Sequence, residues 1–286
     1  MTAMRRLCIS ADSHVVEPAE VYAGLDKRFG DRAPRMIEHP ERGLITDHGD
    51  GTLGYPVGTF ILAGQDFGDP EVRAKVREGF KYARPGTLDT AERMKDQDLE
   101  GLDAEVLYPS VLFSIYQLQD AEIMQATMAN YNDWVSSYAA SAPGRLFALA
   151  LVQLYDLDLA IAEMQRMANQ GAVGLSVPCM APADKPFSDR YYDPFWAAAQ
   201  ELKLPLTMTR LQVNQGRRKP IKTMAAPVRE RHPAVAEPAF SRAGPASPGL
   251  DRGLVSVKMP ARPVVSTFSG PSEMTGGKST RPMRIC

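Results

Sequence analysis

Apolar and polar positions follow a repeating strand–helix order along the first 209 residues. Short apolar runs predict buried strands at residues 6–10, 103–109, 146–152, 172–177 and 204–208. Longer stretches with helical periodicity or a capping residue at their start predict helices at residues 70–83, 89–99, 119–142, 156–167 and 193–202. Residues 40–62 interrupt this order with five glycines, and His48-Gly-Asp-Gly51 predicts a hairpin turn within them.

This order of elements predicts a parallel sheet that helical crossovers bury on both faces. An open doubly wound sheet lacks its best marker, because no G-x-G-x-x-G motif follows the first strand. A closed barrel of eight strand–helix units takes about 250 residues, and only five such units are complete by residue 209. We therefore predict an α/β fold, a TIM-like (βα) barrel that is incomplete and is followed by an irregular Pro-rich tail.

The charge of the chain changes at the same place. Residues 1–210 hold 20 basic and 30 acidic residues, whereas the last 76 hold 13 basic and 4 acidic residues together with 10 of the 23 prolines. Each proline removes a backbone donor and disfavours helix at the residue before it. We predict a partial barrel over residues 1–209 and a basic Pro/Gly/Ser/Arg-rich tail over residues 210–286. The tail is either a disordered interaction segment or the product of out-of-frame translation.

Composition argues against several classes of protein. A formal net charge of −1, with dispersed basic residues and no interleaved aromatics in the tail, argues against nucleic-acid binding. No apolar run approaches the roughly 18 residues of a membrane span, and the first residues lack the apolar stretch of a secretory signal. The three cysteines lie far apart, as expected in a reducing cytoplasm. We expect a cytoplasmic protein that binds a small molecule and neither nucleic acid nor membrane; the oligomeric state is not predicted.

The sharpest chemical signal is Asp12-Ser13-His14, just after the first predicted strand. Residues two apart in an extended chain point to the same side, so this carboxylate and imidazole would converge at the carboxyl end of a strand, where parallel barrels place their sites. Such a pair suits a divalent metal, Zn²⁺ or Mn²⁺. The same pattern also allows Asp12 to cap the next turn and His14 to make a local hydrogen bond. His39 and His48 are expected in surface loops.

Longer motifs around these residues resemble the amidohydrolase-related metal-dependent family, in the branch that includes aminocarboxymuconate-semialdehyde and γ-resorcylate decarboxylases. The motifs occur in order at residues 9–18, 93–110, 131–134, 143–147, 171–175 and 192–196, and the resemblance covers about residues 6–208. It implies a TIM-like barrel with one divalent metal, Zn²⁺ before Mn²⁺, and places Asp12 and His14 at ligand positions. Tyr108 and Ser110, at the end of the second strand of the barrel, are candidates to bind substrate, although Tyr108 also fits a packed strand aromatic.

The chain departs from the family pattern at residues 208–211. The family has a histidine at the end of its fifth strand, where this chain has Thr209, and a late aspartate in a strand–helix segment. His232 and Asp251 lack such surroundings, and we assign them no role. Because resemblance, charge balance and periodicity all end here, we favour a frameshift or fusion near codon 209.

The resemblance implies a metal-dependent enzyme that hydrolyses or non-oxidatively decarboxylates a small carboxylic acid, with aromatic acids among the candidates. The expected loss of its C-terminal half-site would leave this chain with little or no activity. The alternative is a catalytically inactive binding or scaffold protein that recruits an acidic partner through its basic tail. A serine hydrolase is disfavoured, because no G-x-S-x-G motif follows a strand.

Overall fold

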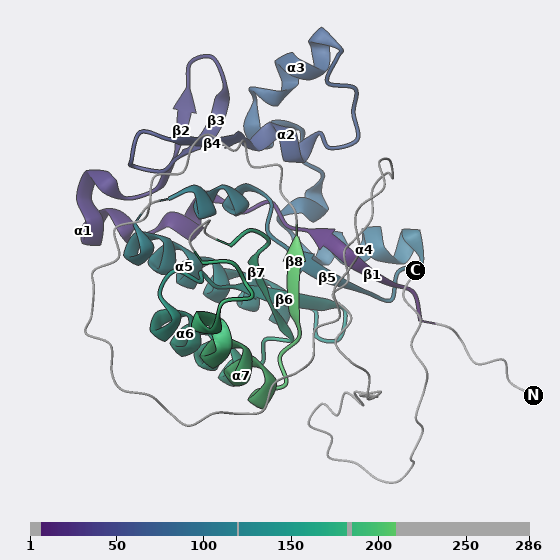
Figure 1. The fold of residues 1–286 in the computed structure, drawn as a ribbon. Helices are drawn as coiled ribbons and strands as arrows, with labels where there is room; N and C mark the ends of the chain where they lie inside the picture. Colours follow the sequence, from purple (N-terminus) through teal and green to yellow (C-terminus); the bar gives the residue numbers. More distant parts are fainter. Residues whose placement is uncertain (1–6, 119, 182–184, 210–286) are drawn as a thin grey trace, which may run out of the picture. The chain divides into compact units, whose positions relative to one another are not determined.

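Five parallel strands form the main sheet of the computed structural model, which describes residues 7–118, 120–181 and 185–209. In sheet order they are β1 (Ile9–His14), β5 (Ala104–Tyr108), β6 (Leu146–Leu151), β7 (Gly174–Pro178) and β8 (Leu206–Thr209). The connecting helices are α4 (Thr90–Glu100), α5 (Ala121–Ala140), α6 (Leu157–Asn169) and α7 (Asp193–Glu201). Figure 1 shows α5, α6 and α7 side by side against this sheet. The predicted strand–helix alternation is confirmed.

The sheet curls as a barrel wall does. Tyr108 Oη on β5 lies 2.8 Å from Thr207 Oγ1 on β8, although two strands separate β5 from β8. In a flat sheet these strands would lie about 14 Å apart, a separation that the two side chains do not span. The described residues therefore confirm the predicted fold, an incomplete TIM-like barrel.

Aspartates fix where the long helices begin. Asp89, Asp120 and Asp156 each accept a hydrogen bond from a backbone N–H in the first turn of α4, α5 and α6. Gly101 ends α4 in the left-handed conformation, with φ at 72°. Because these short-range signals are written in the sequence, the predicted helix positions agree with the structure to within a few residues.

Two apolar clusters pack the helices onto the sheet. One contains Leu107 with Met128 of α5, and the other contains Met164 of α6 with Phe195 of α7, all essentially inaccessible to solvent. Burying each such side chain stabilises the fold by about 1.5–3 kcal/mol. Among the described helices, none has the length and apolar character needed to cross a membrane.

A buried polar cluster joins α5 to α6. The carboxylate of Glu163 accepts hydrogen bonds from Asn132 Nδ2 at 2.6 Å and from Arg166. The Asn132 amide also pairs with both the N–H and the carbonyl of Leu151, at the end of β6. Asn132 thereby satisfies backbone groups that lie beyond the register of β5 with β6.

An insertion between β1 and β5 carries a second, antiparallel sheet of β2 (Arg35–His39), β3 (Gly43–Asp47) and β4 (Leu53–Pro56), in that order. The shorter helices of the described chain are η1 (Ala19–Tyr22), α1 (Leu25–Phe29), η2 (Gly30–Arg32), α2 (Val57–Ile61), α3 (Pro70–Val76), η3 (Gly79–Tyr82), η4 (Pro85–Thr87), η5 (Val111–Gln117) and η6 (Arg190–Tyr192). The predicted hairpin turn joins β3 to β4. The helix predicted over residues 70–83 stops at Val76, because Gly79 takes a positive φ of 56°.

The prediction that His48 lies in a surface loop is wrong. Its side chain is buried, with Nδ1 2.9 Å from Thr52 Oγ1 and Nε2 2.9 Å from Ser114 Oγ in η5. The insertion packs on η5 through this ring, and Figure 1 places the insertion at the end of the main sheet toward which β8 points. Both ring nitrogens have partners, which offsets the cost of burying them.

Folding stability should fall in acid through His48. Burial lowers the pKa of His48 below its ordinary value of 6.5, against the opposing charges of Asp50 and Asp47. The unfolded chain then binds the proton more tightly, so stability is lost as the pH falls below about 6.5. We expect the melting temperature to drop by a few degrees more between pH 8 and pH 5.5 in the wild type than in His48→Gln.

The matched control is His39→Gln, which removes a partly exposed histidine from β2 of the same small sheet. This variant should keep the pH dependence of the wild type. An unchanged pH dependence in His48→Gln would contradict the assignment to His48.

Candidate functional site

Asp12 and His14 converge at the carboxyl end of β1. Asp12 Oδ1 lies 3.4 Å from His14 Nε2, and both side chains remain accessible, at 47% and 41%. The two residues belong to β1 itself rather than to a following loop, because the register with β5 shifts between Ser10 and Ser13 and pairing then continues to His14. The two side chains thus converge as predicted, but they lie on the last residues of β1 rather than after the strand.

A single hydrogen bond selects the tautomer of a neutral His14 ring. Nδ1 lies 2.7 Å from the carbonyl oxygen of Pro109, which follows β5. A carbonyl only accepts, so Nδ1 carries the proton and a neutral ring leaves Nε2 as an acceptor. That acceptor faces the Asp12 carboxylate, which is also an acceptor. Two acceptors at this separation need a proton or a cation between them.

The pair fits a divalent cation. Two ligands of one tetrahedral Zn²⁺, each about 2.0–2.1 Å from the metal, lie roughly 3.3 Å apart. The observed separation of Asp12 Oδ1 and His14 Nε2 is 3.4 Å. The described residues contain no group of three or more His, Cys, Asp or Glu side chains that could hold a metal, so within this part of the chain the pair stands alone.

The other two interpretations of this motif do not hold in the described structure. The next helix, η1, begins after Pro18, so Asp12 does not cap it. The hydrogen bond of His14 reaches a residue 95 positions away along the chain. The position of the pair therefore depends on the pairing of β1 with β5, which is distant in sequence.

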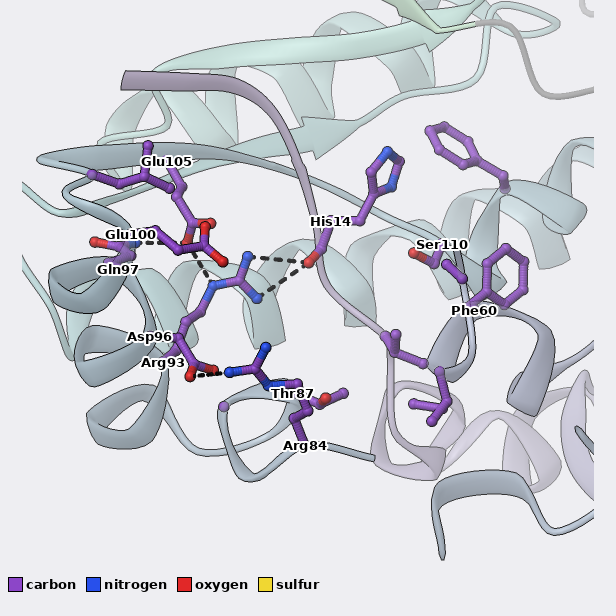
Figure 2. A pocket seen from close by; sticks show the side chains of 16 residues that line it. His14, Phe60, Arg84, Thr87, Arg93, Asp96, Gln97, Glu100, Glu105 and Ser110 are labelled. Atoms are coloured by element: carbon purple, nitrogen blue, oxygen red, sulfur yellow. Dashed lines mark hydrogen bonds and ion pairs between the residues drawn. The ribbon is translucent and has the colours of Figure 1, made fainter. Parts of the chain in front are cut away.

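Arg93 of α4 holds the backbone of His14 from the other side. Its guanidinium donates to the His14 carbonyl oxygen at 3.1 and 3.2 Å and pairs with Glu105 at 2.7 Å. Figure 2 shows Arg93 reaching this carbonyl while the His14 ring points away from it. Glu105 also accepts hydrogen bonds from Ser13 Oγ and from Gln97.

Arg93 and Glu105, which hold the end of β1, are both charged near neutral pH. Burial raises the pKa of Glu105, but the hydrogen bonds from Arg93, Gln97 and Ser13 together outweigh it and hold that pKa below its ordinary value. The Arg93–Glu105 pair, with side chains only 12% and 11% exposed, therefore remains ionised near neutral pH. It fixes the strand that carries Asp12 and His14.

A cavity of about 540 Å³ opens beside His14. Ser110, one of the two predicted substrate-binding residues, lines it together with Phe60 from α2 and Phe113 from η5. Tyr108 is not among the residues that line this cavity. Its ring lies 5.8 Å from the His14 ring, and its hydroxyl pairs with Thr207. Substrate binding by either residue stays a prediction.

Sequence reasoning missed the residues that hold the pair in place. Arg93 and Glu105 lie within the motif at residues 93–110, and the sequence alone assigns them no role. Glu17 follows Asp12 and His14 in the motif at residues 9–18, and its carboxylate accepts N–H bonds from Ser110 and Val111. The partners of these three side chains lie 8 to 94 positions away along the chain. The only available signal was a charged side chain inside an otherwise apolar run, as with Glu105 in its strand and Glu17 after two valines.

Solved structures resemble this chain in fold. An amidohydrolase from Mycobacterium avium subsp. paratuberculosis is 23% identical, with a TM-score of 0.55, over 72% of this chain and 59% of that one. A 2,6-dihydroxybenzoate decarboxylase from Rhizobium is 18% identical, with a TM-score of 0.47, over 75% and 53%. A dihydroxybenzoic acid decarboxylase with bound manganese, from a Polaromonas species, is 16% identical, with a TM-score of 0.47, over 73% and 51%.

The chain covers less than two thirds of each of these structures. No curated protein sequence matches it significantly. The model of the amidohydrolase family matches residues 83–244, which include four of the five strands of the curled sheet. This match takes in more than half of the 286 residues, and the chain belongs to the amidohydrolase family.

Proposed function

We propose that this chain descends from a metal-dependent enzyme in which Asp12 and His14 hold one divalent cation, Zn²⁺ or Mn²⁺, that activates a small carboxylic acid for hydrolysis or decarboxylation. The observation that carries the proposal is the facing pair of acceptors, Asp12 Oδ1 and His14 Nε2, 3.4 Å apart with the ring proton on Nδ1. Membership of the amidohydrolase family supports it.

The bound cation would supply Lewis-acid chemistry to a substrate oxygen or a water. The chain's own residues prepare the place for it. His14 offers an unprotonated Nε2 because Pro109 accepts its Nδ1–H, and Asp12 supplies a negative charge. Arg93 keeps the strand end in position through the His14 carbonyl.

The cavity supports a small organic acid as substrate. Its volume of about 540 Å³ falls in the range of pockets for small molecules. Phe60 and Phe113 give it apolar walls that suit an aromatic ring, and Arg84 and Arg93 contribute guanidinium groups to the lining. Both arginines are paired with carboxylates, so they add little net charge to the lining.

We also propose a cytoplasmic setting and an impaired site. The wide spacing of the three cysteines along the sequence supports a reducing compartment. Catalytic zinc ordinarily has three protein ligands and one open position. With the two ligands that the described residues supply, this site should hold metal weakly and give little turnover.

Metal binding should depend on both members of the pair. In calorimetric titrations of the metal-free protein with Zn²⁺ and Mn²⁺, we expect one weak site per chain in the wild type. Asp12→Asn and His14→Gln should each weaken this site at least tenfold, since the first removes the negative charge and the second removes the imidazole nitrogen. His39→Gln serves as the control and should bind like the wild type.

Equal affinity in the wild type and both variants would contradict the proposed site. Tight binding by the wild type together with turnover of an aromatic carboxylic acid would contradict the proposed impairment. No metal binding at all, with a specific complex that requires the basic tail, would favour the inactive scaffold protein instead.

The segment after residue 209 can be tested in the gene. The family match runs on to residue 244, so 35 of its residues (210–244) lie beyond the boundary that charge balance and periodicity predict. We propose that the reading frame changes near codon 209, and we expect an alternate frame of the coding DNA to encode a histidine followed by further strand–helix alternation. If neither alternate frame encodes such a segment, the proposal is contradicted and the tail is native.

A further inference from the structure

Glu17 is a buried carboxylate that joins the segment after β1 to the segment after β5. It is fully inaccessible to solvent. Its Oε1 accepts the Ser110 N–H at 3.0 Å, and its Oε2 accepts the Val111 N–H at 2.8 Å and the Ser110 N–H at 3.3 Å. Ser110 itself supplies no side-chain cap to η5. The first N–H groups of that helix are satisfied by Glu17, 93 residues earlier in the chain.

This clamp acts one residue away from the hydrogen bond that sets the His14 ring. Ser110 follows Pro109, whose carbonyl accepts His14 Nδ1–H at 2.7 Å. Glu17 also lies three residues after His14 in the sequence. The short segment from His14 to Glu17 and the segment from Pro109 to Val111 are therefore tied at both ends, once through the ring and once through the carboxylate.

We propose that Glu17 is a positioning residue: by holding the Ser110 and Val111 N–H groups it keeps the Pro109 carbonyl aimed at His14 Nδ1, and so keeps His14 in the tautomer that presents Nε2 to a cation. The role in cation binding rests on the proposed function above. The control of the tautomer does not, because it concerns groups that the protein itself supplies.

The electrostatics around Glu17 agree with this role. Burial raises the pKa of Glu17 to about 7, although the N–H groups that it accepts oppose the rise. The titratable groups that face it among the described residues are Tyr22 of η1 and Tyr131 of α5, whose pKa values burial and the charge of Glu17 both raise. Both phenols stay neutral near pH 8, where Glu17 is ionised. The partners of Glu17 are backbone N–H groups, which favour the ionised carboxylate because both of its oxygens accept hydrogen bonds.

A merely structural role would cap η5 and leave the His14 ring alone. The two roles are separated by ¹⁵N NMR of the histidine rings in the metal-free protein at pH 8. The chain has only four histidines, so His14 can be assigned by the loss of its signals in His14→Gln. The wild type should show His14 with its proton on Nδ1 alone.

Glu17→Gln keeps the volume of the side chain but places an NH₂ group against backbone N–H donors. We expect His14 in this variant to change to a mixture of the two tautomers and the affinity for Zn²⁺ to fall about tenfold. The matched control is Glu163→Gln, which alters another buried carboxylate, held by Asn132 and Arg166. It should lower the melting temperature and leave the His14 tautomer unchanged.

A folded Glu17→Gln variant in which His14 stays in the Nδ1–H form would overturn the inference. If this variant does not fold, hydrogen exchange in the wild type decides: the Ser110 and Val111 amides should exchange as slowly as those of β6, and fast exchange at either would contradict the clamp. A wild type that binds neither Zn²⁺ nor Mn²⁺ would refute the proposed function. The tautomer of His14 in Glu17→Gln would still test the positioning role of Glu17.

Discussion

The hydrogen bond from His14 Nδ1–H to the Pro109 carbonyl is the interaction on which the candidate site depends. It commits the one proton of a neutral ring and turns Nε2 into an acceptor that faces the Asp12 carboxylate. Two facing acceptors repel each other, and a proton on Nε2 or a cation between them turns the contact into an attraction. The chemistry of the site thus follows from where a backbone carbonyl of the neighbouring strand is held.

Three charged side chains hold that geometry from both sides of β1. Arg93 fixes the His14 carbonyl, Glu105 fixes Ser13 and Arg93, and Glu17 fixes the start of η5. Glu17 follows β1, whereas Glu105 lies at the start of β5 and Arg93 in α4, the helix before it. Family membership explains the scaffold, whereas these contacts explain why the pair points as it does.

The sequence predicts the signals that act over a few residues and misses those that depend on distant partners. Apolar runs and capping aspartates such as Asp89 and Asp156 located the elements of the curled sheet, and the two-residue spacing of Asp12 and His14 indicated their convergence. The burial of His48 depends on Ser114, 66 residues away, and Glu17 on Ser110, 93 residues away. Nothing local distinguishes His48 from an exposed side chain, and the only local signal for Glu17 is its position after two valines. The predicted boundary at residue 209 rests on resemblance, charge balance and periodicity. The tail of residues 210–286 lies outside the described residues, and the family match runs on to residue 244.

The most direct test of this account is a crystal structure of the chain soaked with Mn²⁺ or Zn²⁺, with anomalous diffraction used to locate the metal. The account predicts an anomalous peak about 2.0–2.2 Å from both His14 Nε2 and Asp12 Oδ1, with Nδ1 still bonded to the Pro109 carbonyl. A peak bound elsewhere, or a ring turned so that Nε2 no longer faces Asp12, would contradict it.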